Sequence, residues 1–146
     1  MARDLATCRP EDRLERAVQL MWDRDIGCVL VTDRDGKLVG IVTDRDACMA
    51  AYTQGLPLAG AVVSSAMARC VWTCSPTSAA RDVEQIMRRH QIRRVPVVDA
   101  SGRPVGIVTL NDLARAASCV PGAAINQREV ESTLTAISMP RQPARC

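Results

Sequence analysis

Hydrophobic residues recur along the chain with two different spacings, and each spacing occurs twice. The first is a helical spacing of three and four residues, which predicts two amphipathic helices ending near Asp25 and Gln91. A proline precedes each stripe, and because proline suits the first turn of a helix, Pro10 and Pro76 are expected to mark the helix starts. The apolar positions are Leu14, Ala17, Val18 and Met21 in the first helix and Ala80, Val83 and Met87 in the second.

The second spacing consists of short runs rich in β-branched residues, which predict strands. In each copy an Asp-x-x-Gly turn separates two such runs, as expected for a hairpin. A shorter apolar stretch precedes the first helix of each copy, and a second helix is predicted to follow the hairpin, so each copy is predicted as β-α-β-β-α. The strand runs cover residues 5–7, 29–32 and 38–43 in one copy and 71–73, 95–98 and 105–109 in the other, and the second helices begin at Thr43 and Thr109.

The two patterns are one repeat, because matched residues are always 66 positions apart, as in Val29 and Val95. A repeat of this length is a supersecondary unit that needs its twin to bury its apolar face, so the copies are expected to pack about a pseudo-twofold axis. The predicted organisation is residues 1–58 for the first copy, 61–120 for the second, and 121–146 for an extra helix and a loose tail.

The extra helix is predicted from its cap and its stripe. Asn126 and Glu129 are spaced as a capping box, and Val130, Leu134 and Ile137 form one apolar face. This helix is expected either to join a contact between two molecules or to cover the edge of its own module. Residues 140–146 are expected to be a loose tail.

Charge and hydropathy narrow the function classes. The formal net charge is +3, with acidic residues interspersed among the basic ones, so an ordinary surface is expected and nucleic-acid binding is not. No stretch approaches the roughly 18 uninterrupted apolar residues of a membrane-spanning helix. The first residues are too polar for a signal peptide, so a cytoplasmic protein without membrane attachment is expected.

The seven cysteines are scattered, which favours reduced thiols in small, buried or half-buried positions over a disulfide framework. Cys70 and Cys74 form the one close pair. Because the chain has a single histidine, His90, and no second cysteine cluster, no zinc site is expected.

Each copy contains a Val-x-Val-x-Asp strand, a glycine-bearing turn and the segment Gly-Ile-Val-Thr-x-x-Asp. Repeats of this size and order resemble a pair of CBS domains, the regulatory repeats named after cystathionine β-synthase. The likeness covers residues 1 to about 118. It implies an α/β fold of two β-α-β-β-α repeats packed sheet to sheet, with clefts between the copies that commonly hold adenine nucleotides.

The segments Thr43 to Asp46 and Thr109 to Asp112 can be interpreted in two ways. From the residues alone, Thr-x-x-Asp before an apolar helix is a capping box. Yet a corner where a strand leads into a helix also presents a hydroxyl, a carboxylate and free backbone N–H groups at one point. The resemblance implies that the two aspartates bind ribose hydroxyls and that the two threonines lie near the ribose or the phosphate.

The copies differ in charge ahead of the second strand, where Arg93 and Arg94 match Gly27 and Cys28. The resemblance implies that this segment faces the Thr/Asp corner of the opposite copy. The stronger predicted cleft then combines Thr43 and Asp46 with His90, Arg93 and Arg94, and the weaker one combines Thr109 and Asp112 with Arg24, Trp72 being a candidate for the pocket lining. The alternatives are a solvated helix end for the cations and core packing for the tryptophan.

The expected function is a standalone regulatory module that binds an adenosine nucleotide such as AMP, ADP or ATP in a cleft between the repeats and signals to a separate protein. No cofactor is required, and the presence of Mg²⁺ is left open. The resemblance also implies a homodimer. An enzyme is not expected, because no acid, base and nucleophile converge. The alternative is a ligand-free structural or interaction module that acts through its dimer surface.

Overall fold

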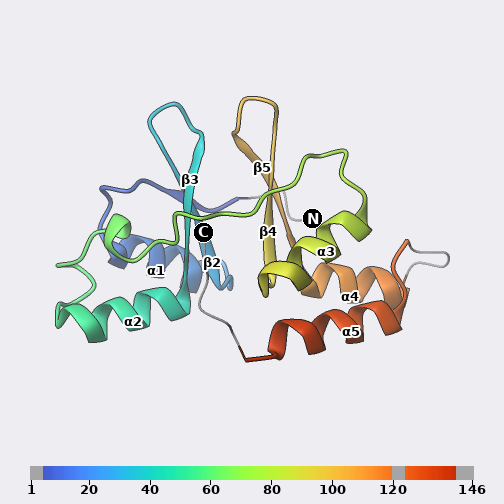
Figure 1. Cartoon of the computed structure of the whole chain (residues 1–146). Helices are drawn as coiled ribbons and strands as arrows, with labels where there is room; N and C mark the ends of the chain where they lie inside the picture. Colours follow the sequence, from blue (N-terminus) through green and yellow to red (C-terminus); the bar gives the residue numbers. More distant parts are fainter. Residues whose placement is uncertain (1–4, 120–123, 141–146) are drawn as a thin grey trace. The chain divides into compact units, whose positions relative to one another are not determined.

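The computed structural model describes residues 5–119 and 124–140 as two compact units (Figure 1). Within these residues, the first unit comprises 5–71 with 100–104, and the second comprises 72–99, 105–119 and 124–140. The boundary between the units falls after residue 71, because residues 61–71 pack in the first unit.

The first unit contains a three-stranded sheet and two helices. The sheet has the order β1-β2-β3, with β1 parallel to β2 and β2 antiparallel to β3. The core is aliphatic, and the helices pack against the strands and against each other. The elements are β1 (Thr7–Cys8), α1 (Leu14–Asp23), β2 (Cys28–Thr32), β3 (Leu38–Thr43), α2 (Asp44–Gln54) and a short 3₁₀ turn, η1 (Val63–Ser65).

The second unit repeats this arrangement around the β4–β5 hairpin. The counterpart of β1 is reduced to one parallel bridge between Cys74 and Val97, which match the paired residues Cys8 and Val31 of the first unit. The order of elements per copy therefore agrees with the predicted β-α-β-β-α unit. The elements are α3 (Ala80–His90), β4 (Arg94–Val98), β5 (Pro104–Thr109), α4 (Leu110–Cys119) and α5 (Gln127–Ser138).

The predicted helix starts at the two prolines are wrong. Helix α1 begins four residues after Pro10, because a local turn is closed first: the Arg9 N–H donates to the Asp12 carboxylate (2.8 Å). Helix α3 likewise begins four residues after Pro76, following a turn in which the Ser75 N–H donates to the Ser78 hydroxyl (3.0 Å). These side-chain acceptors hold the residues around each proline in a turn ahead of the helix.

The ends of both helices lie close to the predicted positions. After α1 and α3 the chain passes through left-handed backbone at Asp25 (φ 50°) and Gln91 (φ 52°), which are matched positions of the repeat. A left-handed residue after the last turn reverses the chain and commonly ends a helix.

Helix α5 has the predicted cap and packs on its own unit. The Glu129 N–H donates to the Asn126 side chain (3.0 Å), and the Asn126 N–H donates to the Glu129 carboxylate (2.7 Å). The helix lies against α3 and α4, with Ile137 buried and Leu134 47% exposed. Of the two expected roles, α5 therefore fulfils that of covering its own module. The predicted tail after Pro140 lies outside the described residues.

The cysteines agree only partly with the expectation of reduced thiols. Cys70 is disulfide-bonded, which contradicts that expectation for this residue, and the scattered spacing gave no signal of it. Five others are free: Cys8, Cys28, Cys48, Cys74 and Cys119. In the described ranges no helix is long and apolar enough to cross a bilayer.

Candidate functional site

The corner between β3 and α2 holds Thr43 and Asp46 in one rigid arrangement. Thr43 ends the strand with extended backbone and caps the helix. Its N–H (3.0 Å) and hydroxyl (2.7 Å) both lie within hydrogen-bond distance of Oδ2 of Asp46, whose own N–H meets the threonine Oγ1 at 3.2 Å. The capping-box interpretation is therefore confirmed, and the same bonds fix the orientation of the carboxylate.

The box leaves one oxygen of Asp46 unused. Among the described residues, its Oδ1 accepts no hydrogen bond, and the side chain is only half-buried. An oriented carboxylate with an open oxygen beside a helix N-terminus can accept hydrogen bonds from a diol such as a ribose. Because that oxygen is already oriented, a ligand hydroxyl need not order the side chain on binding.

The corner between β5 and α4 repeats the box but not the open oxygen. Oδ2 of Asp112 lies 2.8 Å from both the N–H and the hydroxyl of Thr109, while Oδ1 accepts from Arg115 at 2.9 Å. Burial raises the pKa of Asp112, but the hydrogen bonds from Thr109 and Arg115 outweigh it, so the pKa lies below its ordinary value. The second corner is thus occupied by a cation from its own helix.

The sequence analysis missed Arg115, although the repeat contained the signal. Its matched position in the first copy is Met49, which has no charge. An arginine three residues after a helical aspartate is well placed to pair with it. Comparing the copies one turn further along these helices would have shown that only the first corner keeps an uncompensated carboxylate.

The structure brings two candidate residues of the second unit into contact. The rings of Trp72 and His90 stack with centroids 3.6 Å apart and planes inclined by 12°. The pKa of His90 is lowered by partial burial and by the nearby Arg89 charge, so the imidazole is neutral at physiological pH. The histidine therefore contributes an aromatic surface to this pair, and any cations come from the arginines.

Arg93 and Arg94 follow the stacked His90 in the sequence, and Arg93 borders the second corner. The carbonyl of Arg93 accepts a hydrogen bond from the N–H of Leu110 (2.9 Å), so its backbone lies beside the Thr109 corner of its own unit. Within the described residues neither guanidinium has a hydrogen bond or an ion pair, in contrast to Arg88, which pairs with Glu84 (3.3 Å). The two cations of the predicted site are thus available to an anion.

The candidate residues fall into the two units. Thr43, Asp46 and Arg24 belong to the first, and Trp72, His90, Arg93, Arg94, Thr109 and Asp112 belong to the second. The predicted pairing of each corner with cations of the opposite copy remains a prediction.

The cysteines nearest the strands have a structural role. Burial, helped by the Asp12 charge, raises the pKa of Cys8 to about 12, and burial also raises the pKa of Cys74. These matched thiols are therefore poor nucleophiles. In the part of the chain that the structure describes, no three His, Cys, Asp or Glu side chains gather as a metal site.

Comparison with known proteins agrees with this architecture. The CBS domain family matches residues 1–52 and 63–118. The CBS domain-containing protein YhcV of Bacillus subtilis is 33% identical over 138 residues, which cover 94% of this chain and 89% of that protein.

Two solved structures are similar over most of their length. The CBS domain pair of protein MJ0100, solved with 5′-methylthioadenosine and S-adenosyl-L-methionine, has a TM-score of 0.72 and 29% identity and covers 79% of this chain and 89% of that one. Hypoxic Response Protein I, solved with two coordinated zinc ions, has a TM-score of 0.72 and 30% identity and covers 83% of this chain and 95% of that one. With its two matched segments and its two β-α-β-β-α copies, the chain belongs to the CBS domain family.

Proposed function

We propose that the chain is a regulatory CBS pair that binds an adenosine nucleotide and passes the state of occupancy to a separate protein. The observation that carries this proposal is the open Oδ1 of Asp46, held in place by the capping box with Thr43. The ribose diol would donate to this oxygen. The adenosine ligands of MJ0100 support the choice of ligand class.

The anionic part of the ligand would be met by Arg93 and Arg94, which lack partners among the described residues. In this proposal they face the Thr43 corner, as the family resemblance implies. The stacked Trp72 and His90 offer an aromatic face to an adenine base. Because His90 is neutral, the net charge of the ligand is balanced by the two arginines, which favours a mono- or diphosphate over an uncharged adenosine compound.

Calorimetry and thermal shift with AMP, ADP, ATP, 5′-methylthioadenosine and S-adenosylmethionine test this proposal. A carboxylate-to-hydroxyl hydrogen bond contributes roughly 1.5–3 kcal/mol. Asp46→Ala is therefore expected to weaken binding about ten- to hundredfold. The matched control is Asp44→Ala, which removes the same charge two residues away at an exposed position outside the box.

Two further variants test whether Arg93 binds the phosphate of the ligand and which of the two Thr/Asp corners binds its ribose. Arg93→Ala should weaken the binding of phosphorylated ligands more than that of 5′-methylthioadenosine. Asp112→Ala should have the smaller effect, because Arg115 already occupies its Oδ1. A larger effect of Asp112→Ala than of Asp46→Ala would reverse the ranking of the corners. Absence of binding below about millimolar ligand would favour the alternative, a ligand-free interaction module.

A further inference from the structure

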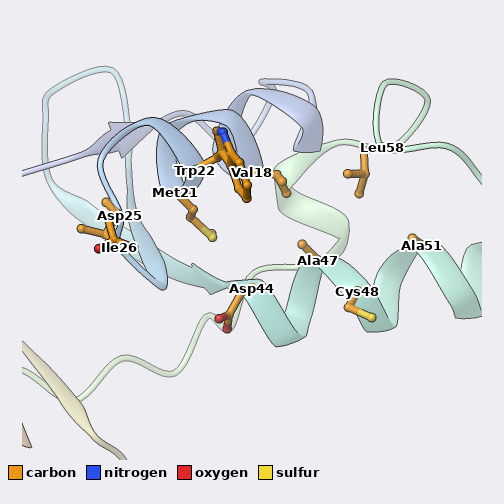
Figure 2. A pocket seen from close by; sticks show the side chains of 10 residues that line it. All are labelled: Val18, Met21, Trp22, Asp25, Ile26, Asp44, Ala47, Cys48, Ala51 and Leu58. Carbon is orange, nitrogen blue, oxygen red and sulfur yellow. The ribbon is translucent and has the colours of Figure 1, made fainter.

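The two units are hollowed in different places. On the first unit a groove of about 480 Å³ lies between α1 and α2, with Trp22 exposed at its rim (Figure 2). The matched place on the second unit is covered, because α5 packs on α3 and α4. The second unit instead has a cavity of about 160 Å³ between the start of α3 and the β4–β5 hairpin. Its apolar lining includes Val83 of α3, Val97 of β4 and Leu113 of α4.

One difference between the copies explains the space. Ala80, which lines the cavity, stands at the position of Leu14, and Leu14 is fully buried in the first core. Two other lining side chains are larger than their matched residues, but they do not close the cavity. Val108 therefore stays half-buried, whereas the matched Val42 is fully buried.

A second difference leaves the cavity open to solvent. In the first unit, Val63 of η1 is fully buried in the first core, and its N–H donates to the Asp12 carbonyl (2.9 Å). The residue that matches Val63 is Glu129, which lies in α5 and does not line the cavity. The exposed residues Ser75 and Pro76 therefore form an uncovered mouth.

The start of α3 determines which polar group fits at this place. Within the described residues, the N–H groups of Ala80 and Arg81 donate no hydrogen bond. The matched N–H groups, of Leu14 and Glu15, donate to two backbone carbonyls from residues 58–61 (3.0 and 3.2 Å). Ala79, the N-cap of α3, has no side-chain oxygen to replace these carbonyls. A carbonyl or carboxylate oxygen of a ligand can accept the two bonds while an attached apolar group fills the cavity.

We propose that this cavity binds a small acyl compound, with an aliphatic tail of about three to five carbons that ends in a carbonyl or carboxylate oxygen. The tail takes the place that the Leu14 side chain has in the first unit, and the oxygen takes the place of the Ala61 carbonyl. The size is sufficient, because an apolar cavity of about 150 Å³ accommodates benzene. None of the lining residues belongs to the candidate nucleotide site, so the inference adds a second ligand class and does not depend on the proposed function.

Calorimetry with a chain-length series tests the size of the site. The probes are acetate, butyrate, isovalerate, hexanoate and decanoate at constant ionic strength. Binding should strengthen about fourfold with each added methylene group and stop strengthening at about six carbons, when the cavity is full. Isovaleramide measures how much the negative charge contributes, and isoamylamine, which has no acceptor oxygen, should not bind.

Ala80→Leu introduces the residue of the first unit and tests the location. It should weaken isovalerate binding by about tenfold or more and raise the melting temperature of the unliganded protein, because the added side chain fills the cavity. The matched control is Ala79→Leu, which adds the same group at an exposed position and should bind isovalerate as the wild type does. A second measurement needs no variant: isovalerate should slow the methylthiolation of Cys74, which lines the cavity, but not that of exposed Cys119.

Four results would each overturn the proposal. They are the absence of saturable binding by any of the acids, an affinity that keeps rising to decanoate, undiminished binding to Ala80→Leu, and equal labelling of Cys74 with and without isovalerate. Calorimetry with AMP reports on the nucleotide site separately. Ala80→Leu should bind AMP as the wild type does, so failure of the nucleotide site and failure of the cavity site can be distinguished.

Discussion

The contact between Thr133 and Glu84 yields a quantitative prediction about stability. Thr133 is fully buried and Glu84 is 7% exposed, and the threonine hydroxyl donates to the glutamate carboxylate. Thr133→Val keeps the shape of the side chain and removes only the hydroxyl, so no cavity accompanies the loss. The carboxylate then keeps Arg88 (3.3 Å) as its remaining hydrogen-bond donor.

The magnitude follows from the charge on the acceptor. A hydrogen bond to a buried carboxylate contributes about 1.5–3 kcal/mol to the free energy of unfolding. For a chain of this length each kcal/mol shifts the melting temperature by about 3–4 °C, so Thr133→Val is expected to melt about 5–12 °C lower. Differential scanning calorimetry measures this directly.

A control and a second variant make the prediction specific. Thr135→Val removes an exposed hydroxyl that donates to the Glu131 carbonyl in the same helix (3.0 Å), and it should change stability by less than about 0.5 kcal/mol. Adding Glu84→Val to Thr133→Val removes both polar partners and should recover most of the loss. Equal melting of Thr133→Val and wild type, or no recovery in the double variant, would refute this account of how α5 is held.

Three further predictions concern other parts of the chain. Because the pKa of Asp112 is lowered on folding, its contribution to stability is present above about pH 4 and is lost as the pH falls through the folded pKa. In acid titrations, the free energy of unfolding of Asp112→Asn should therefore fall less with decreasing pH than that of the wild type. Gly40→Ala should lower the free energy of unfolding by about 1–3 kcal/mol in urea titrations, because its new methyl carbon would lie 3.1 Å from the Ala68 carbonyl oxygen. Cys8, with its pKa of about 12, should react with a thiol reagent only after unfolding, whereas exposed Cys119 should react in the native protein. Mass spectrometry of labelled peptides measures the extent of reaction at each cysteine. Rapid labelling of Cys8 in the native protein would contradict its burial.

The capping boxes were the most accurate part of the sequence-based prediction. The boxes at Thr43, Thr109 and Asn126 are present, because each depends on residues three positions apart and on the chemistry of a helix N-terminus. The strands were also located well, since alternation and turn residues are local signals.

The start of α1 was predicted less accurately because contacts distant in sequence also hold it, in addition to the local turn before it. The first N–H of α1, at Leu14, donates to the Ala61 carbonyl (3.0 Å), and the next, at Glu15, donates to the Leu58 carbonyl (3.2 Å). These acceptors lie more than 40 residues away, and no local pattern reveals them. Local proline preference predicted an earlier start than the structure has.

The candidate site was predictable in its residues but not in its contacts. The overlay of the two copies identified the corners and the arginines, because they are differences between matched positions. The stack of Trp72 on His90 was not predicted, since the rings are 18 positions apart and come from a loop and a helix end. The groove beside Trp22 was missed because an exposed tryptophan does not interrupt the helical pattern of α1.

The packing of α5 also affects how the chain folds during synthesis. All buried members of the first hydrophobic core lie at or before Met67, whereas the second core includes Ile125 and Ile137. Because synthesis proceeds from the N-terminus, the first unit can bury its core early, while Leu110 and Leu113 stay without their covering helix until the ribosome has passed residue 137. A nascent chain halted before α5 therefore leaves Leu110 and Leu113 uncovered, whereas one arrested after residue 71 has already made every buried member of its first core.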